Sequence, residues 1–209
     1  MDSVVGIDLS GVSRTTIGQT ALSQLSLEER PRLLDRRLFA RGERHADATL
    51  IDWIAERRPL VVAIDAPLTL PHSLGCELVD CPRCRPGSAQ YLMRDVDRMV
   101  GGMSTAQLAS IAFRGAYLAR IIRGLGSEAI ETYPAGVLRD LGLTAQVDRR
   151  DQARIDAALE PLVGAYVPGT PDEQHAVCAA LVAADYARGV AVPKLGDDGV
   201  IWLAGQRET

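Results

Sequence analysis

The sequence predicts a mixed α/β domain in which a five-stranded sheet carries helices on its faces. Three short apolar runs follow one another near the start, which is typical of an antiparallel β-meander, and helix-length segments then alternate with further strands. The 209 residues suit a single domain, residues 1–209, because a chain of this length with 47% apolar and 24% charged residues can bury one sizeable core.

The meander is expected at the N-terminus. Residues 3–9 form an apolar run suited to a central strand, and the threonine-rich residues 15–22 form the second strand. Gly11 and Ser13 predict a tight hairpin turn between them. Residues 33–40 contain arginines, so we expect an edge strand there.

A helix, a buried strand and an insertion come next. Residues 46–58 have helical periodicity that ends at Pro59, and residues 60–65 form a continuous apolar run that ends in Asp65. Residues 68–102 are rich in Pro, Gly, Cys and charge and lack sustained periodicity. We interpret them as a Cys/Arg-rich insertion within the domain, because long loops of this kind are usually functional.

The second half of the chain alternates strands and helices. Apolar residues recur at helical spacing over residues 104–126, where Gly124 and Gly126 end the pattern. The remaining expected elements are a strand at 128–134, one or two helical turns at 134–143, helices at 148–163 and 171–189, and a last short strand at 199–204.

Three carboxylates share one position in this arrangement. Asp8, Asp65 and Glu131 each end a short apolar strand and precede a turn. The carboxyl ends of parallel strands line the ligand crevice of an α/β sheet. Carboxylates gathered there repel one another unless a cation or a proton relieves them, and Mg²⁺ or Mn²⁺ is the usual relief. Turn and cap formation by individual aspartates is the alternative.

The start of the last long helix adds polar groups to this set. Asp172 and Glu173 lie in its first turn, and His175 lies three residues after Asp172 on the same helix face. Asp172 is a candidate metal ligand, and His175 is a candidate ligand or proton donor. The whole set, Asp8, Asp65, Glu131, Asp172 and His175, suits two-metal phosphoryl chemistry.

These stretches together resemble a known family. VVGIDLSG, VVAIDAPLTLP, AIETYPAGVLRDLG, DEQHAVCAALVA and GDDGVIWL are similar, in this order, to the predicted RNase-H-like nuclease family also called domain of unknown function 429. The resemblance implies an RNase H-like fold and a metal-dependent nuclease. In related Holliday-junction-resolvase-like enzymes the acidic ligands lie on the first strand, the fourth strand and the last helix, which are the places of Asp8, Asp65 and Asp172. In DEQHA, Asp172 and His175 stand as though exchanged relative to the family pattern.

The insertion contains a candidate zinc site. Cys76, Cys81 and Cys84 have the spacing C-x4-C-x2-C, and His72 precedes Cys76 by four residues. Three thiolates and one imidazole suit tetrahedral Zn²⁺. An iron–sulfur site with Cys178 as fourth ligand, a disulfide and free thiols remain alternatives.

Any nucleic-acid contact must be local, because a net charge of −4 provides no general basic field. The candidate patch consists of arginines in or beside the insertion and on the following helix: Arg83, Arg85, Arg94, Arg98, Arg114, Arg120 and Arg123. The alternative is a solvated surface in which Arg94 or Arg98 pairs with Asp95 or Asp97. Tyr91, Tyr117 and Tyr133 are candidates for base stacking.

The leading hypothesis is a metal-dependent nuclease in the cytoplasm. No signal peptide is recognisable, and no apolar run approaches the ~20 residues of a membrane span. One alternative is a non-catalytic RNase H-like binding domain. Another is an ATP-using phosphotransferase related to hexokinase and actin, since IDLSGVSRTTIG loosely fits their strand, aspartate and Gly/Ser hairpin.

Overall fold

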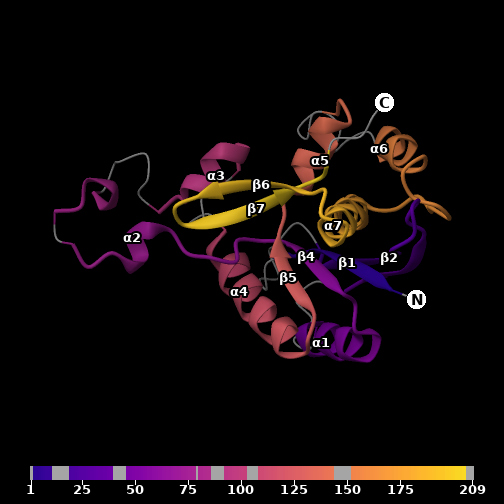
Figure 1. Cartoon of the computed structure of the whole chain (residues 1–209), viewed down its shortest axis with the longest axis horizontal. Helices are drawn as coiled ribbons and strands as arrows, with labels where there is room; N and C mark the ends of the chain where they lie inside the picture. Colours follow the sequence, from indigo (N-terminus) through magenta and orange to yellow (C-terminus); the bar gives the residue numbers. More distant parts are fainter. Residues whose placement is uncertain are drawn as a thin grey trace.

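A central sheet organises the computed structural model of the chain, which describes residues 2–10, 19–39, 46–78, 80–85, 92–102, 108–143 and 152–205. Its strand order is β3-β2-β1-β4-β5 (Figure 1). The first three strands are antiparallel, whereas β4 runs parallel to both β1 and β5. The bounds are β1 Ser3–Asp8, β2 Ala21–Ser26, β3 Leu33–Leu38, β4 Val61–Asp65 and β5 Glu128–Glu131. This confirms the mixed five-stranded sheet and the edge position of the third strand.

Helices cover both faces of the sheet (Figure 1). One layer contains α1 (Ala46–Arg57) and α4 (Ala109–Gly124). The other contains α5 (Pro134–Asp140), α6 (Gln152–Leu159) and α7 (Pro171–Ala187). No helix in the described ranges is both long and apolar enough to cross a bilayer.

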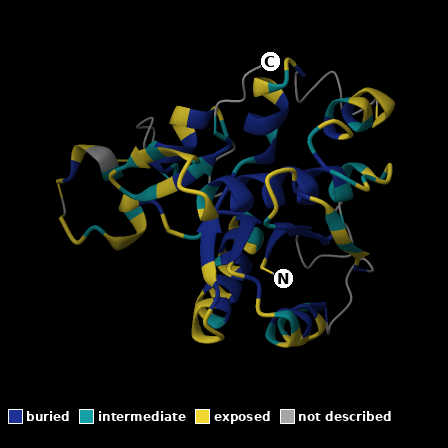
Figure 2. Ribbon diagram, turned by 45° about the vertical axis from the view of Figure 1, so that its right-hand side comes forward, coloured by how far each residue is buried: buried dark blue, intermediate teal, exposed yellow. Residues whose placement is uncertain are grey.

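Strand alternation divides the core into two clusters, because successive side chains point to opposite faces. The first cluster packs against α1 and α4 and includes Val5, Ile7, Val62, Ile64 and Ala129 from the sheet. The second packs against α5, α6 and α7 and includes Val4, Val61, Ala63 and Ile130 from the sheet. Figure 2 shows this buried interior in dark blue. The face to which each strand-end side chain points therefore follows from its position in the alternation.

Helix α7 lies directly on β1 because Gly6 has no side chain. A Cβ at Gly6 would stand 2.1 Å from both the Ala176 carbonyl oxygen and the Ala180 nitrogen. Such a close approach of two backbones requires glycine. The contact fixes how α7 sits along the strand and brings the residue before Ala176 to the strand's end.

Some predicted boundaries are wrong. The second strand begins at Ala21, which pairs with Asp8, whereas the prediction started it at residue 15; residues 19 and 20 are not strand. Residues 11–18, with Gly11 and Ser13, lie outside the described residues. The helices predicted at 104–126 and 148–163 are α4 and α6, and residues 103–107 and 144–151 likewise lie outside the description.

Four short elements were not predicted. The insertion contains α2 (His72–Gly75), the 3₁₀ helix η1 (Pro82–Cys84) and α3 (Asp95–Val100). The last predicted strand is β7 (Gly199–Leu203), and it pairs with an unpredicted strand, β6 (Val192–Gly196), in a separate two-stranded sheet. Val96 and Val100 of α3 pack on Ile201 and Leu203 of β7.

Candidate metal centre

Two aspartates end the neighbouring parallel strands side by side. Asp8 is the last residue of β1 and pairs in register with Asp65, the last residue of β4. Each comes two positions after a residue that faces α7, namely Gly6 and Ala63. By strand alternation both carboxylates therefore point to the α7 face of the sheet.

His175 completes this group from the first turns of α7. Its Nδ1 lies 3.7 Å from Oδ2 of Asp8, and the residue is 5% exposed. Asp8, Asp65 and His175 each offer one ligand atom, and these atoms lie within 4.8 Å of one another. Two carboxylates and an imidazole at this spacing fit a divalent cation, which would relieve the repulsion of the aspartates.

The group opens into a cleft of about 520 Å³ at the carboxyl ends of the parallel strands. Its walls come from the strand ends, the start of α4, the end of α3 and β7. The side chains beside the cluster are Leu9, Ala66, Pro67, Val100, Leu108, Ile111, Thr132, Tyr133 and Ile201. A partly apolar cleft with a few convergent polar groups is the usual form of a binding site.

Glu131 also lines the cleft, but its place in the strand alternation is on the α1 and α4 face of the sheet, opposite to that of Asp8 and Asp65. It pairs with Ile64, whose side chain faces α1 and α4, and the residue beyond it, Thr132, is the one in phase with Asp65. The Glu131 carboxylate accepts hydrogen bonds from the Leu68 backbone N–H (2.8 Å) and from Arg94. Thr132 donates to the Trp202 carbonyl (2.9 Å).

Arg94 is fully buried between two carboxylates. Its Nη1 and Nη2 donate to Glu131 at 2.8 and 2.5 Å, and its Nε and Nη2 donate to Asp97 at 3.1 and 2.5 Å. Thr69 accepts a further bond from Nη1 at 2.9 Å. The trio of Arg94, Glu131 and Asp97 carries one positive and two negative charges when all are ionised. Arg94 thus supplies the cation that sequence reasoning assigned to a metal at Glu131.

The electrostatics of the trio follow from this charge count. Burial raises the pKa of the Glu131 carboxyl above its ordinary value of 4.5, while the hydrogen bonds and charge of Arg94 oppose that rise. Burial alone would lower the pKa of the Arg94 guanidinium, but its bonds to Glu131 and Asp97 outweigh burial and raise it. One cation shared by two buried carboxylates accounts for both directions.

Asp172 lies in the first turn of α7 and binds backbone. Its Oδ2 accepts the Gln19 N–H at 2.7 Å, which ties the chain before β2 to the helix. Thr170 is the N-cap in a capping box with Glu173, and Glu173 also pairs with Arg36 at 3.0 Å. Asp172 is not a member of the group formed by Asp8, Asp65 and His175.

Most of the predicted arginine patch is engaged within the chain. Besides Arg94, Arg98 pairs with Asp95, and Arg114 binds Asp47 at 2.5 Å and the Ser10 carbonyl at 2.6 Å. Arg123 donates to the Ala129 carbonyl at 2.7 Å. Arg85 and Arg120 are exposed, whereas the side chain of Arg83 and residue Tyr91 lie outside the description.

The insertion brings together a second group. His72, Cys76, Cys81 and Cys84 have ligand atoms within 4.8 Å of one another, and all four cysteines of the chain are thiols. Cys178 belongs to the apolar core around α7 and not to this group.

Sequence reasoning missed the role of Gly6, the burial of Arg94 and its pairing with Glu131, although the pairing of Arg94 with Asp97 was the stated alternative. The signal for the first was a glycine within a buried strand, which often marks a close backbone approach. The spacing of Arg94 and Asp97, three residues apart at the start of a helix, indicated only their own pairing, and Glu131 is 37 residues away in the chain.

Solved structures with the same fold exist. The structure of RuvC from Thermus thermophilus in complex with a Holliday junction substrate aligns with 95% of this chain and 99% of its own, with a TM-score of 0.52 and 16% identity. A second Thermus thermophilus RuvC structure aligns with 90% of this chain and 96% of its own, with a TM-score of 0.52 and 13% identity. The chain therefore has the predicted RNase H-like fold. No protein-family model and no curated protein matches it in sequence, so the family resemblance stays a prediction.

Proposed function

We propose that this chain is a metal-dependent nuclease that hydrolyses phosphodiester bonds in its cleft. The observation that carries the proposal is the convergence of Asp8, Asp65 and His175. Their ligand atoms lie within 4.8 Å of one another, beside the cleft at the carboxyl ends of β1 and β4. The RuvC structure with its Holliday junction substrate lends support, because that protein of the same fold binds nucleic acid. Fold alone does not fix function, so the proposal depends on the site.

One divalent ion, rather than two, suits the site. Asp8, Asp65 and His175 would hold it, while Glu131 is already paired with Arg94 at 2.5 and 2.8 Å. Carboxylates suit Mg²⁺ and Mn²⁺ equally, but an imidazole ligand favours a transition metal, so Mn²⁺ matches the whole donor set better. Bound there, the ion would supply an activated water and stabilise negative charge on phosphate.

The protein side chains have separate roles in this mechanism. Asp8 and Asp65 would hold the cation from the ends of two buried strands that pair in register, which would keep the reacting groups aligned. His175 would be the third ligand of the ion, held beside Asp8 by the contact of α7 with β1. Arg94 holds the wall of the cleft through Glu131 and Asp97, and its guanidinium is unavailable to clamp a phosphate.

Helix α4 offers a surface for single-stranded nucleic acid. Phe113 and Tyr117 lie four residues apart and are 62% and 47% exposed, and Arg120 lies 5.8 Å from the Tyr117 ring centroid. Leu108 and Ile111 at the start of the same helix line the cleft. Exposed aromatic rings with an arginine are typical stacking platforms for unpaired bases. We infer that unpaired bases stack on these two rings.

The test is hydrolysis of labelled single-stranded, duplex and branched DNA and RNA. We expect cleavage that requires Mn²⁺ or Mg²⁺, is abolished in Asp65→Asn, and persists in Glu131→Gln as the matched carboxylate control. Phe113→Ala combined with Tyr117→Ala should weaken binding of single strands without weakening Mn²⁺ binding. Cleavage that survives in EDTA, or in Asp65→Asn, would refute the proposal.

A non-catalytic binding domain is the second candidate, and the Arg94–Glu131 pair favours it. A guanidinium in the place of a second cation leaves less positive charge to stabilise a transition state. This candidate predicts nucleic-acid binding without cleavage, and a gain in stability when Asp65→Asn removes one of two adjacent negative charges. The phosphotransferase alternative depends on residues 11–18, which lie outside the description, and predicts thermal stabilisation by ATP alone.

A further inference from the structure

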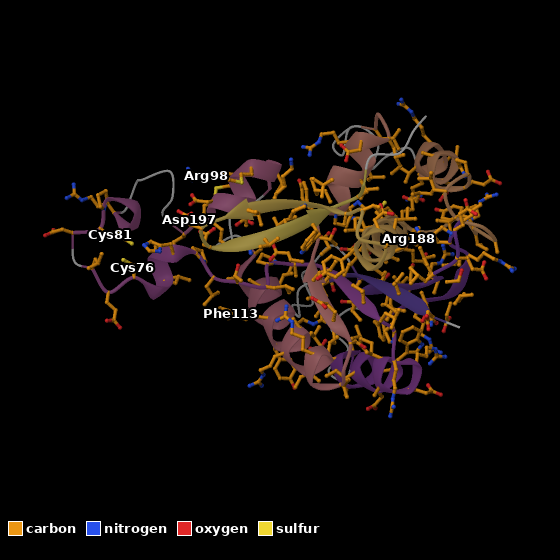
Figure 3. All side chains as sticks on the ribbon, in the orientation of Figure 1. Cys76, Cys81, Arg98, Phe113, Arg188 and Asp197 are labelled. Carbon is orange, nitrogen blue, oxygen red and sulfur yellow. The ribbon has the colours of Figure 1, made fainter. Side chains whose placement is uncertain are left out.

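We propose that residues 72–84 form a zinc-binding lobe held by His72, Cys76, Cys81 and Cys84, separate from the cleft. Figure 1 shows the segment around α2 projecting away from the sheet, and Figure 3 shows Cys76 and Cys81 together on this projection. None of the four residues lines the cleft. The lobe and its metal are therefore independent of the proposed nuclease.

The ligand geometry fits a single tetrahedral ion. Zinc–sulfur bonds of about 2.3 Å place neighbouring ligand atoms about 3.8 Å apart around one zinc ion. Sγ of Cys81 lies 3.8 Å from Nε2 of His72, and all four ligand atoms lie within 4.8 Å of one another. An iron–sulfur cluster places several iron and sulfide atoms between its cysteines and needs wider spacing. Four protein ligands close the coordination shell, so the zinc would be structural.

Two backbone turns shape the segment that carries Cys81 and Cys84. The Cys84 N–H donates to the Cys81 carbonyl at 3.0 Å, and the Cys81 N–H donates to the Leu78 carbonyl at 3.3 Å. These turns, with η1 between them, bring the two thiols of the C-x2-C pair to one side. Short C-x2-C turns of this kind supply two of the four ligands in many structural zinc sites.

The described residues of the lobe, 72–78 and 80–84, form no apolar core that would hold it together. Among its described residues only Cys81 is buried, while Leu74 and Leu78 are 54% and 72% exposed. Figure 2 shows the projection mostly in yellow and teal, in contrast to the dark blue sheet. So short a segment cannot bury enough apolar surface to offset its conformational entropy. Metal binding is the ordinary source of stability for such a segment.

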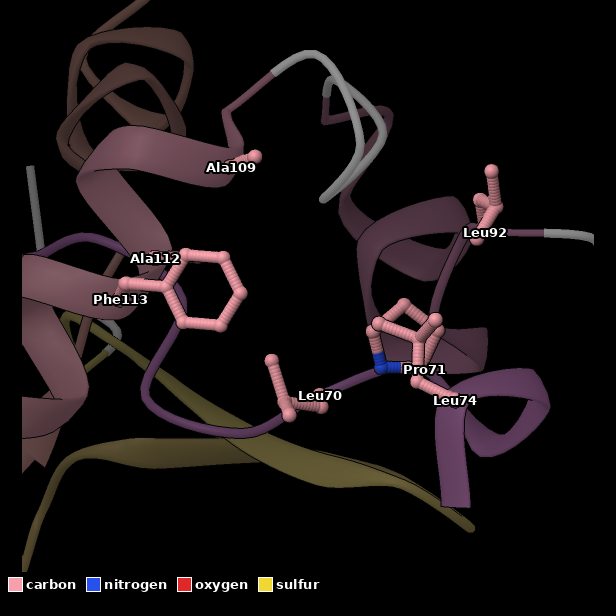
Figure 4. A pocket seen from close by; sticks show the side chains of 7 residues that line it. All are labelled: Leu70, Pro71, Leu74, Leu92, Ala109, Ala112 and Phe113. Carbon is pink, nitrogen blue, oxygen red and sulfur yellow. The ribbon is translucent and has the colours of Figure 1, made fainter. Parts of the chain in front are cut away.

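The base of the lobe is attached without a metal. The Leu92 N–H donates to Oγ of Ser73 at 3.2 Å, and Thr69 accepts a bond from Arg94. Figure 4 shows apolar side chains from the lobe base and from α4 around a small cavity of about 40 Å³, lined by Leu70, Pro71, Leu74, Leu92, Ala109, Ala112 and Phe113. Loss of zinc should therefore release the tip of the lobe and leave the sheet and cleft intact.

The test is the metal content of the whole chain, purified without chelators. We expect about one zinc per chain by mass spectrometry of the metal, and thiolate-to-cobalt absorption after exchange with Co²⁺. Cys81→Ser combined with Cys84→Ser should lose the zinc while far-ultraviolet circular dichroism stays within a few per cent of the wild type. Cys178→Ala, a cysteine outside the group, and Asp65→Asn, in the cleft, are the controls and should keep it.

Limited proteolysis gives a second measure on the wild-type chain. Removal of zinc should expose residues 72–85 to cleavage at least tenfold faster, with the remaining fragment resistant. The proposal is overturned if the protein contains no zinc and its three loop thiols react with a thiol reagent at the same rate with and without Zn²⁺. It is also overturned if two of these cysteines form a disulfide, or if the double serine variant retains zinc.

Discussion

Replacing Arg94 by methionine should be far more damaging than replacing its partner Glu131 by glutamine. Methionine keeps much of the buried volume but leaves Glu131 and Asp97 as two buried carboxylates without a cation. Breaking a buried ion pair from one side costs about 3–5 kcal/mol. For a domain of this size, 1 kcal/mol corresponds to about 2–4 °C in the melting temperature, so Arg94→Met should lower it by about 10 °C.

Glu131→Gln removes the surplus negative charge of the trio and keeps Arg94 paired with Asp97. A carboxamide oxygen in the place of Oε2 still accepts from Leu68 and from Nη1 of Arg94, whereas the amide nitrogen in the place of Oε1 cannot accept from Nη2. This loses about 1 kcal/mol of hydrogen bonding, and relief of repulsion offsets part of that loss. We expect stability within about 1 kcal/mol of the wild type. The double variant should cost less than Arg94→Met alone, with a coupling energy of about 2 kcal/mol.

Urea unfolding of the four proteins, monitored by circular dichroism with a common slope, measures these free energies. The same preparations are titrated with Mn²⁺. An Arg94→Met variant within 1 kcal/mol of the wild type would refute the buried-pair account. So would a loss of Mn²⁺ binding in Glu131→Gln, because Glu131 would then act as a metal ligand.

Three further predictions use other residues. Gly6→Ala inserts a methyl group 2.1 Å from the α7 backbone, so it should cost about 3 kcal/mol in urea unfolding and weaken Mn²⁺ binding. Gly124→Ala is the control: its added methyl group meets nothing within 4 Å in helix α4, so it should lose no stability and leave Mn²⁺ binding unchanged. Asp172→Asn keeps an oxygen that can accept the Gln19 N–H, so the helix start should stay in place. Calorimetry should then find a Mn²⁺ affinity within about twofold of the wild type. A complete loss of Mn²⁺ binding would make Asp172 a ligand. Because the pKa of Glu131 is raised in the folded state, protonated Glu131 contributes stability below pH 4.5, and this contribution is lost as pH rises through the folded-state pKa. The wild type should therefore lose stability relative to Glu131→Gln above pH 4.5. Identical pH profiles of the two proteins would contradict this.

The sequence predicted the parts of the fold in which local pattern and tertiary structure agree. Residues 61–65 and 171–187 are apolar enough, and long enough, to be a buried strand and a buried helix in any α/β arrangement. The second strand was misplaced because ALSQLS buries serine and glutamine, whereas the preceding threonines had the stronger strand propensity. Strand β6 is mostly exposed and contains Pro193 and Lys194, so it carries no apolar pattern.

Which strand-end carboxylates meet depends on the pairing register of the strands, and the sequence does not reveal that register. Asp8 and Asp65 both end strands and also pair in register, so the prediction that they meet agrees with the structure. Glu131 ends its strand as well, but it pairs with Ile64, one residue short of Asp65, and this single step places it on the other side of the alternation. The partner of Arg94 was equally hidden, because Glu131 is 37 residues away in the chain.

Anomalous diffraction from a crystal soaked in Mn²⁺ tests the central claim most directly. We expect one strong peak bounded by Asp8, Asp65 and His175, with the Arg94–Glu131 pair unchanged and no peak beside Glu131. The same soak of Asp65→Asn should remove the peak. A cleft without manganese, or a second ion at Glu131 that displaces Arg94, would contradict it.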